Sequence, residues 1–204
     1  MNVSMLIEKI RGLTLGRILR RFNYFYGRPN QTDPEEIITI LRVASSVLPG
    51  KSDVKVLEIG SWMGCSTIPL ARTTRVFHGK LYCCDLWQGT PVDDLSTIAK
   101  FCDVFAIFWK RVGRAGVRDV VVPLHGLSQD VLPILKSKTF DMIYIDGDHR
   151  YSGIKHDILQ AKRLIRKDGV IAGHDYDVGH PDVMRAVNEI FGKPKHKGRV
   201  WWVK

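Results

Sequence analysis

The sequence contains no apolar run that approaches the ~20 residues needed to cross a bilayer, so no membrane-spanning segment is predicted. Residues 1–22 also lack the pattern of a secretory leader. Charged side chains interrupt the apolar residues there, namely Glu8, Lys9, Arg11 and Arg17. Because no continuous hydrophobic region and no small-residue cleavage site remain, we expect a cytoplasmic protein, with attachment to a membrane surface as the alternative.

Paired cysteines are missing as well. The chain of 204 residues has four cysteines, and no two of them have C-x-x-C spacing: Cys65, Cys83, Cys84 and Cys102. This usage argues against a disulfide framework and against a zinc site built on cysteine pairs. It predicts free thiols in a reducing compartment.

Internal repeats and low-complexity tracts are also absent. Hydrophobic residues make up 45% of the chain and charged residues 25%, which is typical of a globular protein. The length fits one domain with a small appendage. We predict an N-terminal basic, helical cap segment at residues 1–50 and a larger domain at residues 51–204.

The net charge of +10 is concentrated near the two ends of the sequence. Residues 1–22 carry five basic and one acidic side chain, and residues 185–204 carry six basic and one acidic side chain. The intervening 20 basic and 19 acidic side chains nearly cancel. The basic ends are either solvated surfaces or sites for an anionic partner, such as a phosphate-bearing substrate, a membrane surface or nucleic acid.

Short apolar runs alternate with helical patterns through most of the chain. A helix is predicted to begin at Asp33-Pro34 and to stop before Pro49. Strands are then predicted at 55–59, 81–84, 120–124, 140–145, 170–172 and 200–203, with helices at 67–72, 95–112, 128–135, 154–165 and 183–191. This order predicts an α/β fold in which a mostly parallel sheet has helices on both faces.

Polar residues gather where the predicted strands end. In parallel sheets ligands bind beyond the carboxyl ends of the strands, so these positions form the predicted site. They are Glu58–Gly64, Asp85–Trp87, His125–Ser128, Asp146–Tyr151 and His174–Asp177.

The turn after the first strand has G-x-x-x-G spacing, at Gly60 and Gly64, and lacks the G-x-G-x-x-G of a dinucleotide fold. Side chains of Ser61, Trp62 and Met63 fill this turn, so a pyrophosphate fits it poorly. A ligand without phosphates fits better.

Charged groups around this turn match an amino acid joined to a nucleoside. Glu58 suits an ammonium group, and the helix terminus near Ser66 suits a carboxylate. One strand later Asp85 suits the two hydroxyls of a ribose, and Trp87 could cover an adenine face. Together these features predict S-adenosylmethionine as the ligand.

Carboxylates and histidines follow the fourth and fifth strands. Asp146, Asp148 and His149 follow the fourth, while His174 and Asp175 follow the fifth. Neighbouring strand ends would bring these side chains together, and carboxylates beside a histidine predict a site for a hard cation. Asp148 is predicted instead to cap the next helix, and His78, His156, His180 and His196 are predicted to be surface residues.

Four runs of the sequence, VLEIGSWMGCST, LYCCDLW, FDMIYIDGDHRYSGIKHDI and GVIAGHDY, resemble class I methyltransferases that use S-adenosylmethionine. More narrowly, they are similar to the macrocin O-methyltransferase and cephalosporin-hydroxylase-like group of methyltransferase family 24 type. The resemblance covers about residues 54–204. It implies a Rossmann-like sheet of six to seven strands that ends in an antiparallel hairpin, with a short sixth strand near Lys195–Lys197.

The resemblance also implies roles for individual residues. In similar enzymes that act on sugar hydroxyls, magnesium is held by an aspartate that matches Asp146 and by an acidic pair, of which Asp175 matches the second member. His174 stands in place of the first, and an imidazole ligand shifts the preference toward manganese, iron or zinc. His149 matches the position of the base that takes the hydroxyl proton.

The predicted function is therefore S-adenosylmethionine-dependent O-methylation of a hydroxyl on a sugar, glycan or related small molecule, assisted by a divalent cation. Predicted cofactor contacts are Glu58, Gly60, Ser61, Gly64, Ser66, Asp85, Leu86, Trp87, Ser128 and Asp146. An RNA methyltransferase is an alternative suggested by the charge, although no N-P-P-Y or D-P-P-Y segment follows the fourth strand. A non-catalytic binding module is another, and a homo-oligomer is compatible with the sequence.

Overall fold

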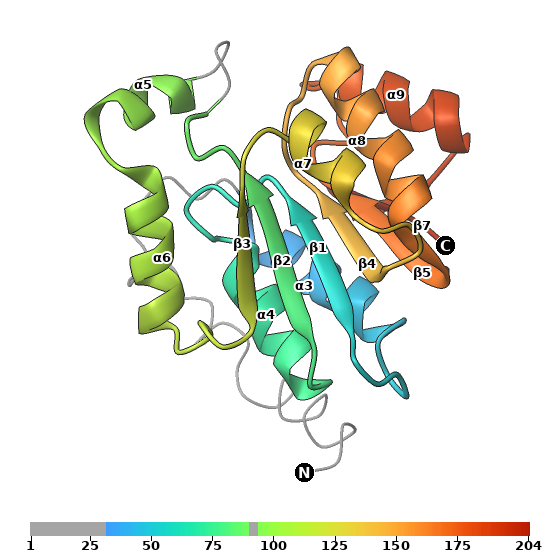
Figure 1. Cartoon of the computed structure of the whole chain (residues 1–204). Coiled ribbons are helices and arrows are strands. Elements are labelled where there is room, and N and C mark those ends of the chain that lie inside the picture. Colours follow the sequence, from blue (N-terminus) through green and yellow to red (C-terminus); the bar gives the residue numbers. More distant parts are fainter. Residues whose placement is uncertain (1–31, 90–93) are drawn as a thin grey trace. The chain divides into compact units, whose positions relative to one another are not determined.

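The computed structural model describes residues 32–89 and 94–204 (Figure 1). The chain divides into a unit at Met1–Pro34 and a compact unit at Glu35–Lys204. The predicted basic segment at residues 1–22 lies outside the described residues. Within the described part of the chain, no helix has the length and apolar character needed to cross a membrane.

Helices and strands alternate along the chain as the sequence predicts. They are α3 (Pro34–Ser45), β1 (Lys55–Ile59), α4 (Thr67–Val76), β2 (Lys80–Asp85), α5 (Asp94–Phe101), α6 (Val104–Arg114), β3 (Val121–His125), α7 (Ser128–Ile134), β4 (Phe140–Ile145), α8 (Tyr151–Leu164), β5 (Ile165–Gly173), α9 (Pro181–Phe191), β6 (Lys195–Lys197) and β7 (Val200–Val203).

The strands form one seven-stranded sheet in the order β3-β2-β1-β4-β5-β7-β6. Strands β1 to β5 pair in parallel, whereas β7 runs antiparallel to both β5 and β6. The mostly parallel sheet, the terminal hairpin and the short sixth strand at Lys195–Lys197 are thereby confirmed.

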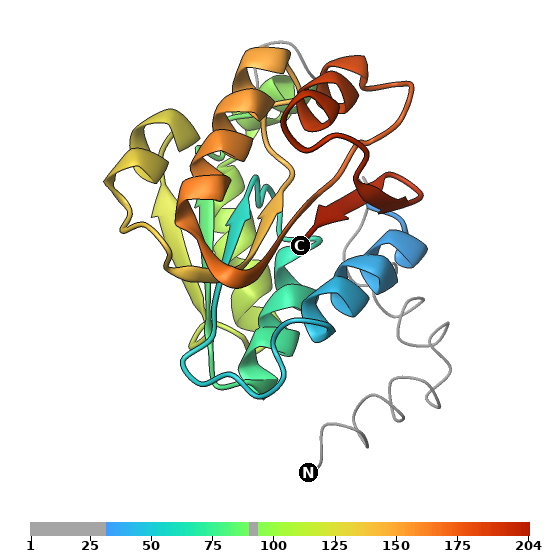
Figure 2. The ribbon, with the colours of Figure 1, turned by 90° about the vertical axis from the view of Figure 1, so that its right-hand side faces the viewer.

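Each face of the sheet packs against its own helical layer. Val56 of β1 and Leu81 of β2 belong to a core shared with α3, α4 and α6, while Leu57 and Ile143 belong to a core shared with α7, α8 and α9. Figures 1 and 2 show these layers from two directions. Because neighbouring residues of a strand point to opposite faces, strands buried on both sides are mostly apolar. The buried carboxylates within them, Glu58 of β1 and Asp141 of β4, accept hydrogen bonds.

The long helix predicted at residues 95–112 is wrong. The structure has two helices there, and α5 ends at Phe101 before α6 begins at Val104. Asp103 caps α6 by accepting a hydrogen bond from the amide of Ala106 at 2.9 Å. Aspartate is favoured at the start of a helix, where its side chain accepts hydrogen bonds from backbone amides, and it is disfavoured inside one. The apolar periodicity does not register this difference and therefore predicts a single helix that is too long.

A buried carboxylate joins three segments at the end of the sheet where β4 begins. Asp141 accepts hydrogen bonds from the amide of Lys55 at 3.0 Å and from the side chains of Lys51 and Arg166 at 3.1 and 2.7 Å. Burial alone would raise the pKa of Asp141, but these three partners outweigh it and hold the pKa below its usual value.

Replacing Asp141 with asparagine should lower the free energy of unfolding by about 1–3 kcal/mol at neutral pH, because two cationic partners lose a buried charged acceptor. Since the folded pKa is depressed, the wild-type advantage should be full above the unfolded pKa and vanish as pH falls through the folded pKa. Urea unfolding at several pH values measures both. Asp53→Asn, in the exposed pair with Lys55, is the control and should change stability little. An equal loss in both variants would contradict the role of Asp141.

Candidate functional site

The carboxyl ends of four neighbouring strands lie level with one another. In the sheet register Ile59 of β1 pairs with Cys84 of β2 and with Ile145 of β4, and Ile145 pairs with Gly173 of β5. The residues that follow, starting at Gly60, Asp85, Asp146 and His174, therefore begin at one edge, as predicted.

Glu58, in β1, is completely buried, and its carboxylate organises the turn that follows. It accepts hydrogen bonds from the hydroxyls of Ser61 at 2.7 Å and Ser66 at 2.6 Å, and a further one from Thr67. Burial raises the pKa of Glu58 to about 7, although the three hydroxyls oppose this rise. The structure thus places Glu58, Ser61 and Ser66 together, as one internal hydrogen-bonded unit.

Gly60 lies where two loops come closest. Its φ is +85°, and a Cβ atom added there would lie 2.0 Å from the carbonyl oxygen of Asp146. The amide of Asp146 in turn donates to the carbonyl of Ile59 at 2.7 Å. Only glycine allows the turn after β1 to pass this close to the start of the loop after β4. Gly64, also at positive φ, donates to the carbonyl of Ser61 at 2.7 Å and closes the turn.

Asp85, at the end of β2, holds the same turn from the other side. Its carboxylate accepts hydrogen bonds from the amides of Ser61 and Trp62, both at 2.7 Å, and of Trp87 at 2.6 Å. Burial raises the pKa of Asp85, and these amides oppose the rise. A carboxylate offers about four acceptor directions, and these amides use three of them.

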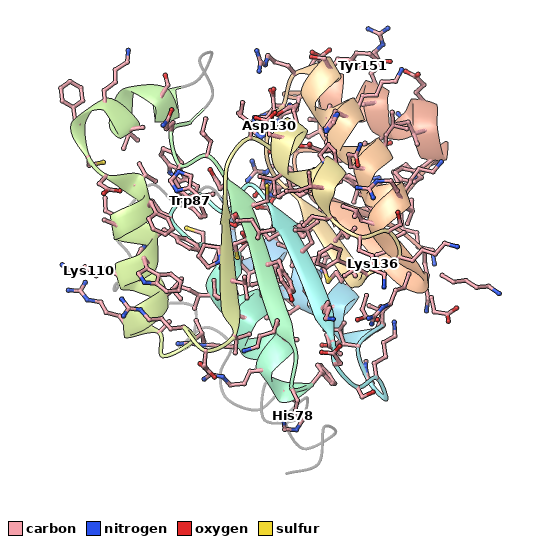
Figure 3. All side chains as sticks on the ribbon, in the orientation of Figure 1. His78, Trp87, Lys110, Asp130, Lys136 and Tyr151 are labelled. Carbon is pink, nitrogen blue, oxygen red and sulfur yellow. The ribbon has the colours of Figure 1, made fainter. Side chains whose placement is uncertain are left out.

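Trp87 does not have the role that the sequence suggests. Only 3% of the residue is exposed, and its ring packs 4.8 Å from that of Phe105 and 5.0 Å from that of Phe108 on α6. Figure 3 shows it between α6 and the strands. The prediction that Trp87 covers an adenine face is wrong for this arrangement, because the neighbouring aromatic rings already cover its ring.

Two further predicted cofactor contacts lie at the same edge. The carbonyl of Leu86 lies 3.2 Å from the imidazole of His125, the last residue of β3. Ser128 is the first residue of α7, at the end of the loop after β3. Their positions are compatible with the predicted cofactor contacts, which stay predictions.

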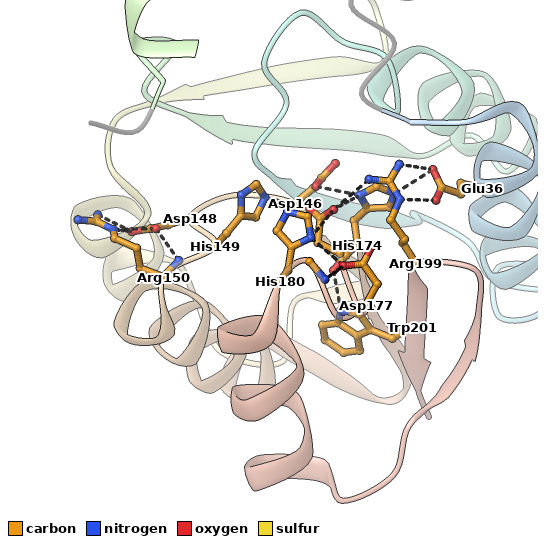
Figure 4. Close-up of polar contacts among 12 residues, drawn as sticks. Glu36, Asp146, Asp148, His149, Arg150, His174, Asp177, His180, Arg199 and Trp201 are labelled. Carbon is orange, nitrogen blue, oxygen red and sulfur yellow. Dashed lines mark hydrogen bonds and ion pairs between the residues drawn. The ribbon is translucent and has the colours of Figure 1, made fainter. Parts of the chain in front are cut away.

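His174 lies at the centre of an ion-pair network beside these loops (Figure 4). Its Nδ1 is 3.1 Å from the carboxylate of Asp175 and 3.6 Å from that of Asp146, and its Nε2 is 3.1 Å from that of Glu36. Only 2% of its side chain is exposed. Burial alone would lower the pKa of His174, but the three carboxylates raise it to about 10.

This charge state bears directly on the predicted metal ligands. The structure brings Asp146, His174 and Asp175 together, with one donor atom of each within 4.8 Å of the others. Without a metal ion the three carboxylates favour the protonated ring of His174, and a protonated imidazole has no lone pair for a metal ion. His174 would have to release its proton to act as a ligand, and its role as a ligand stays a prediction.

Asp175 connects this buried network to the surface. The Nε2 atom of His149 lies 2.9 Å from one oxygen of Asp175, and the guanidinium of Arg199 donates to the other at 3.3 Å. His149 and His174 hold the pKa of Asp175 well below its usual range even though burial opposes them. Burial raises the pKa of Asp146, and His174 opposes that rise. Asp175 also has a positive φ of 58°, a strained conformation of the kind found at functional sites.

Three residues of the network were not identified from the sequence. Glu36 on α3 accepts two hydrogen bonds from Arg199, at 2.8 and 3.0 Å, and fixes the terminal hairpin beside α3 (Figure 2). His180, predicted to be a surface residue, has its Nδ1 3.0 Å from Asp177 and 3.6 Å from Asp175. Only His180 carried a usable signal, because it ends the loop that follows β5.

Two other expectations need correction. Asp148 does not cap α8, whose N-cap is Arg150; it accepts hydrogen bonds from the amide and guanidinium of Arg150 instead. Arg199 was counted among the basic residues open to an anionic partner, but it is engaged with Glu36 and Asp175.

The terminal hairpin packs against the end of β5, where His174 and Asp175 follow. Trp201 of β7 is buried, and its indole donates to the carbonyl of His174 at 3.2 Å. A Cβ atom on Gly173 would lie 2.6 Å from the Trp201 ring. This close packing fixes the backbone at the point where β5 delivers His174 and Asp175.

Comparison with known proteins supplies independent information. A family described as a methyltransferase domain matches residues 57–176, more than half of the chain. Catechol O-methyltransferase B of Danio rerio is 28% identical over 71% of this chain and 51% of its own length, so the chain spans about half the length of this relative.

Two solved structures share the fold. The O-methyltransferase TomG from Streptomyces achromogenes, in complex with S-adenosylmethionine, has a TM-score of 0.64 and 18% identity over 93% of this chain and 88% of its own. CalS11, a TDP-rhamnose 3'-O-methyltransferase, has a TM-score of 0.61 and 14% identity over 97% and 86%. These similarities confirm the Rossmann-like class I methyltransferase fold.

The close approach at Gly60 gives a test of the site's architecture. Gly60→Ala should lower the free energy of unfolding by several kcal/mol, because positive φ costs an alanine about 1–2 kcal/mol and the clash with Asp146 adds about 1–3 kcal/mol. Gly50→Ala, at φ +78° with nothing within 4 Å of the added Cβ atom, should show the first cost alone. Urea denaturation of both variants measures the difference. An equal loss of unfolding free energy in the two variants would contradict the close approach of the loop after β1 to the loop after β4.

Proposed function

The chain belongs to the methyltransferase-domain family, and from this membership we propose that it is a class I methyltransferase that moves the methyl group of S-adenosylmethionine to a hydroxyl oxygen. The observation that carries the choice of an oxygen acceptor is the contact between His149 and Asp175, at the edge where the predicted cofactor loop also lies. A histidine held by a carboxylate is suited to take a proton from an alcohol.

The turn between β1 and α4 and the end of β2 fit the cofactor. S-adenosylmethionine, when bound, supplies a methyl group on a positively charged sulfur. Asp85 keeps an acceptor direction for a ribose hydroxyl, while its other hydrogen bonds fix the turn at Ser61 and Trp62. Gly60, Ser61, Gly64 and Ser66 shape this turn, and we propose that the cofactor lies against it.

Asp146 is better placed than Glu58 to bind the ammonium group of the cofactor. Glu58 is fully buried and its oxygens accept three hydroxyl hydrogen bonds, whereas the side chain of Asp146 is partly exposed beside Gly60. A cation next to Asp146 would favour the ionised carboxylate against the effect of burial. We therefore assign Glu58 to holding the turn and Asp146 to direct contact.

His149 is the proposed base. It takes the proton of the acceptor hydroxyl as that oxygen attacks the methyl carbon. Asp175, 2.9 Å from its ring, orients the imidazole and stabilises the protonated form that results. His174 and Arg199 keep Asp175 ionised and fixed for this task. The remaining work of the chain is to align the acceptor oxygen with the methyl carbon and sulfur.

The proposed acceptor is a hydroxyl on a sugar, glycan or related small molecule. Relatives are named for catechol and for TDP-rhamnose, both of which offer hydroxyl groups. RNA methylation and a purely binding role stay alternatives, but the His149–Asp175 contact favours catalysis over binding alone.

The divalent cation predicted at Asp146, His174 and Asp175 stays a proposal, supported by donor atoms of the three residues that lie within 4.8 Å of one another. His174 would bind such an ion through its neutral ring, so binding would release the proton that the neighbouring carboxylates favour on it. The function proposed for His149 needs no metal at these three residues, so no step of the reaction is assigned to one.

The cofactor assignment is tested at Asp85. Asp85→Asn should weaken S-adenosylmethionine binding by about 10- to 100-fold, because a hydrogen bond to a charged acceptor is lost. Isothermal titration calorimetry measures the affinity, and thermal unfolding shows whether the turn is preserved. Asp130→Asn, an exposed aspartate on α7 near the same edge (Figure 3), should leave the affinity unchanged. Wild-type affinity in Asp85→Asn would remove Asp85 from the binding site.

The base is tested by His149→Ala. Methyl transfer should slow by roughly 100-fold or more, the usual size of a general-base contribution, while S-adenosylmethionine affinity is unchanged. A panel of catechols, nucleotide sugars and glycans provides the acceptors for the rate measurement. His196→Ala, an exposed histidine on β6, serves as the control. If His149→Ala transfers methyl groups at the wild-type rate, proton removal belongs to another group.

A further inference from the structure

Two histidines and an aspartate converge on the accessible side of the network. The Nε2 atom of His149 lies 2.9 Å from one oxygen of Asp175, and the Nδ1 atom of His180 lies 3.6 Å from the other. One donor atom from each of the three residues lies within 4.8 Å of the others. The histidine side chains are 40% and 31% exposed, so an ion from solvent can reach them.

The spacing of these donor atoms is close to that of a coordination shell. Bonds of about 2.0–2.1 Å in a tetrahedral shell place neighbouring ligand atoms about 3.3 Å apart. The two distances from the histidines to Asp175 lie on either side of this value. The rings of His149 and His180 also lie close to each other, with their centroids 5.1 Å apart, although Nδ1 of His180 would have to exchange its contact with Asp177 for the ion.

The charge of the network also favours a divalent cation. Four carboxylates lie in it, on Glu36, Asp146, Asp175 and Asp177, beside the guanidinium of Arg199. A divalent ion at Asp175 would add positive charge next to these carboxylates. Its three proposed ligands do not include His174, which contacts Glu36 and Asp146.

The donor types select the class of ion. Two imidazoles and one carboxylate suit zinc, cobalt or iron, whereas magnesium prefers oxygen ligands alone. We propose that His149, Asp175 and His180 form a binding site for a late first-row divalent ion of the zinc class. This set differs from the predicted trio by having two accessible histidines in place of the buried His174 cation.

Occupation of this site would have a consequence for catalysis. A metal ion on the nitrogen of His149 that faces Asp175 breaks the contact that holds the proposed base, and it withdraws the ring from proton transfer. Turnover should therefore fall as the site fills. This consequence rests on the proposed function, whereas the binding of the ion does not.

Cobalt provides a direct probe of the site. Protein freed of metal with a chelator and exchanged into chelator-free buffer is titrated with Co²⁺, whose visible absorption reports coordination. We expect one equivalent to bind, Zn²⁺ to displace it and a large excess of Mg²⁺ to leave it bound. His180→Ala and His180→Gln should weaken Co²⁺ binding by more than the roughly 10- to 100-fold typical of an outer-shell change, while Asp130→Asn and His196→Ala, at exposed positions outside the network, should retain it. Circular dichroism confirms that each variant is folded.

The outcomes separate this proposal from the proposed function. No Co²⁺ binding by the folded wild type, or binding that survives both His180 variants, would overturn the metal site and leave the methyltransferase assignment untouched. Binding lost with His180 supports the site, and a fall in methyl transfer on adding Zn²⁺ then supports His149 as base as well. If Zn²⁺ binds through His180 but turnover rises, the metal site stands and the assignment of His149 as the base fails.

Discussion

The buried positive charge of His174 holds three carboxylates from different parts of the chain around one imidazole ring. Glu36 lies on α3, Asp146 follows β4, and Asp175 is the next residue after His174 in the chain. Carboxylates brought this close would repel one another without a cation between them. The same charge keeps Asp175 ionised, so the orientation of His149 at the surface depends on a residue that does not face solvent.

Much of the architecture could be predicted because it follows from local patterns. Buried parallel strands are mostly apolar, so their ends, and with them Asp85, Asp146 and Asp175, can be found from the sequence. Helix breaks are harder to predict. The separation of α5 from α6 depends on whether Asp103 caps a new helix, and apolar periodicity does not report that choice.

The chemical roles of individual residues were less predictable than their positions. Glu58 and Asp85 were expected to face a ligand, yet much of their hydrogen-bonding capacity holds the chain's own turn. Trp87 follows a strand end but packs into the core, since α6 supplies aromatic partners that its own segment does not reveal. Glu36 and Arg199 are distant in sequence from His174, and only the folded chain brings their charges together.

The site can be completed only after the terminal hairpin has been synthesised. Arg199 and Trp201 contact Asp175, Glu36 and the backbone of His174, yet they are translated after every other element that they contact. While a growing chain folds from its N-terminal side, the parallel strands can pair before these residues emerge, but the buried carboxylates cannot yet be neutralised in full. A nascent chain that already has its sheet would therefore still lack a finished catalytic edge until the hairpin has left the ribosome.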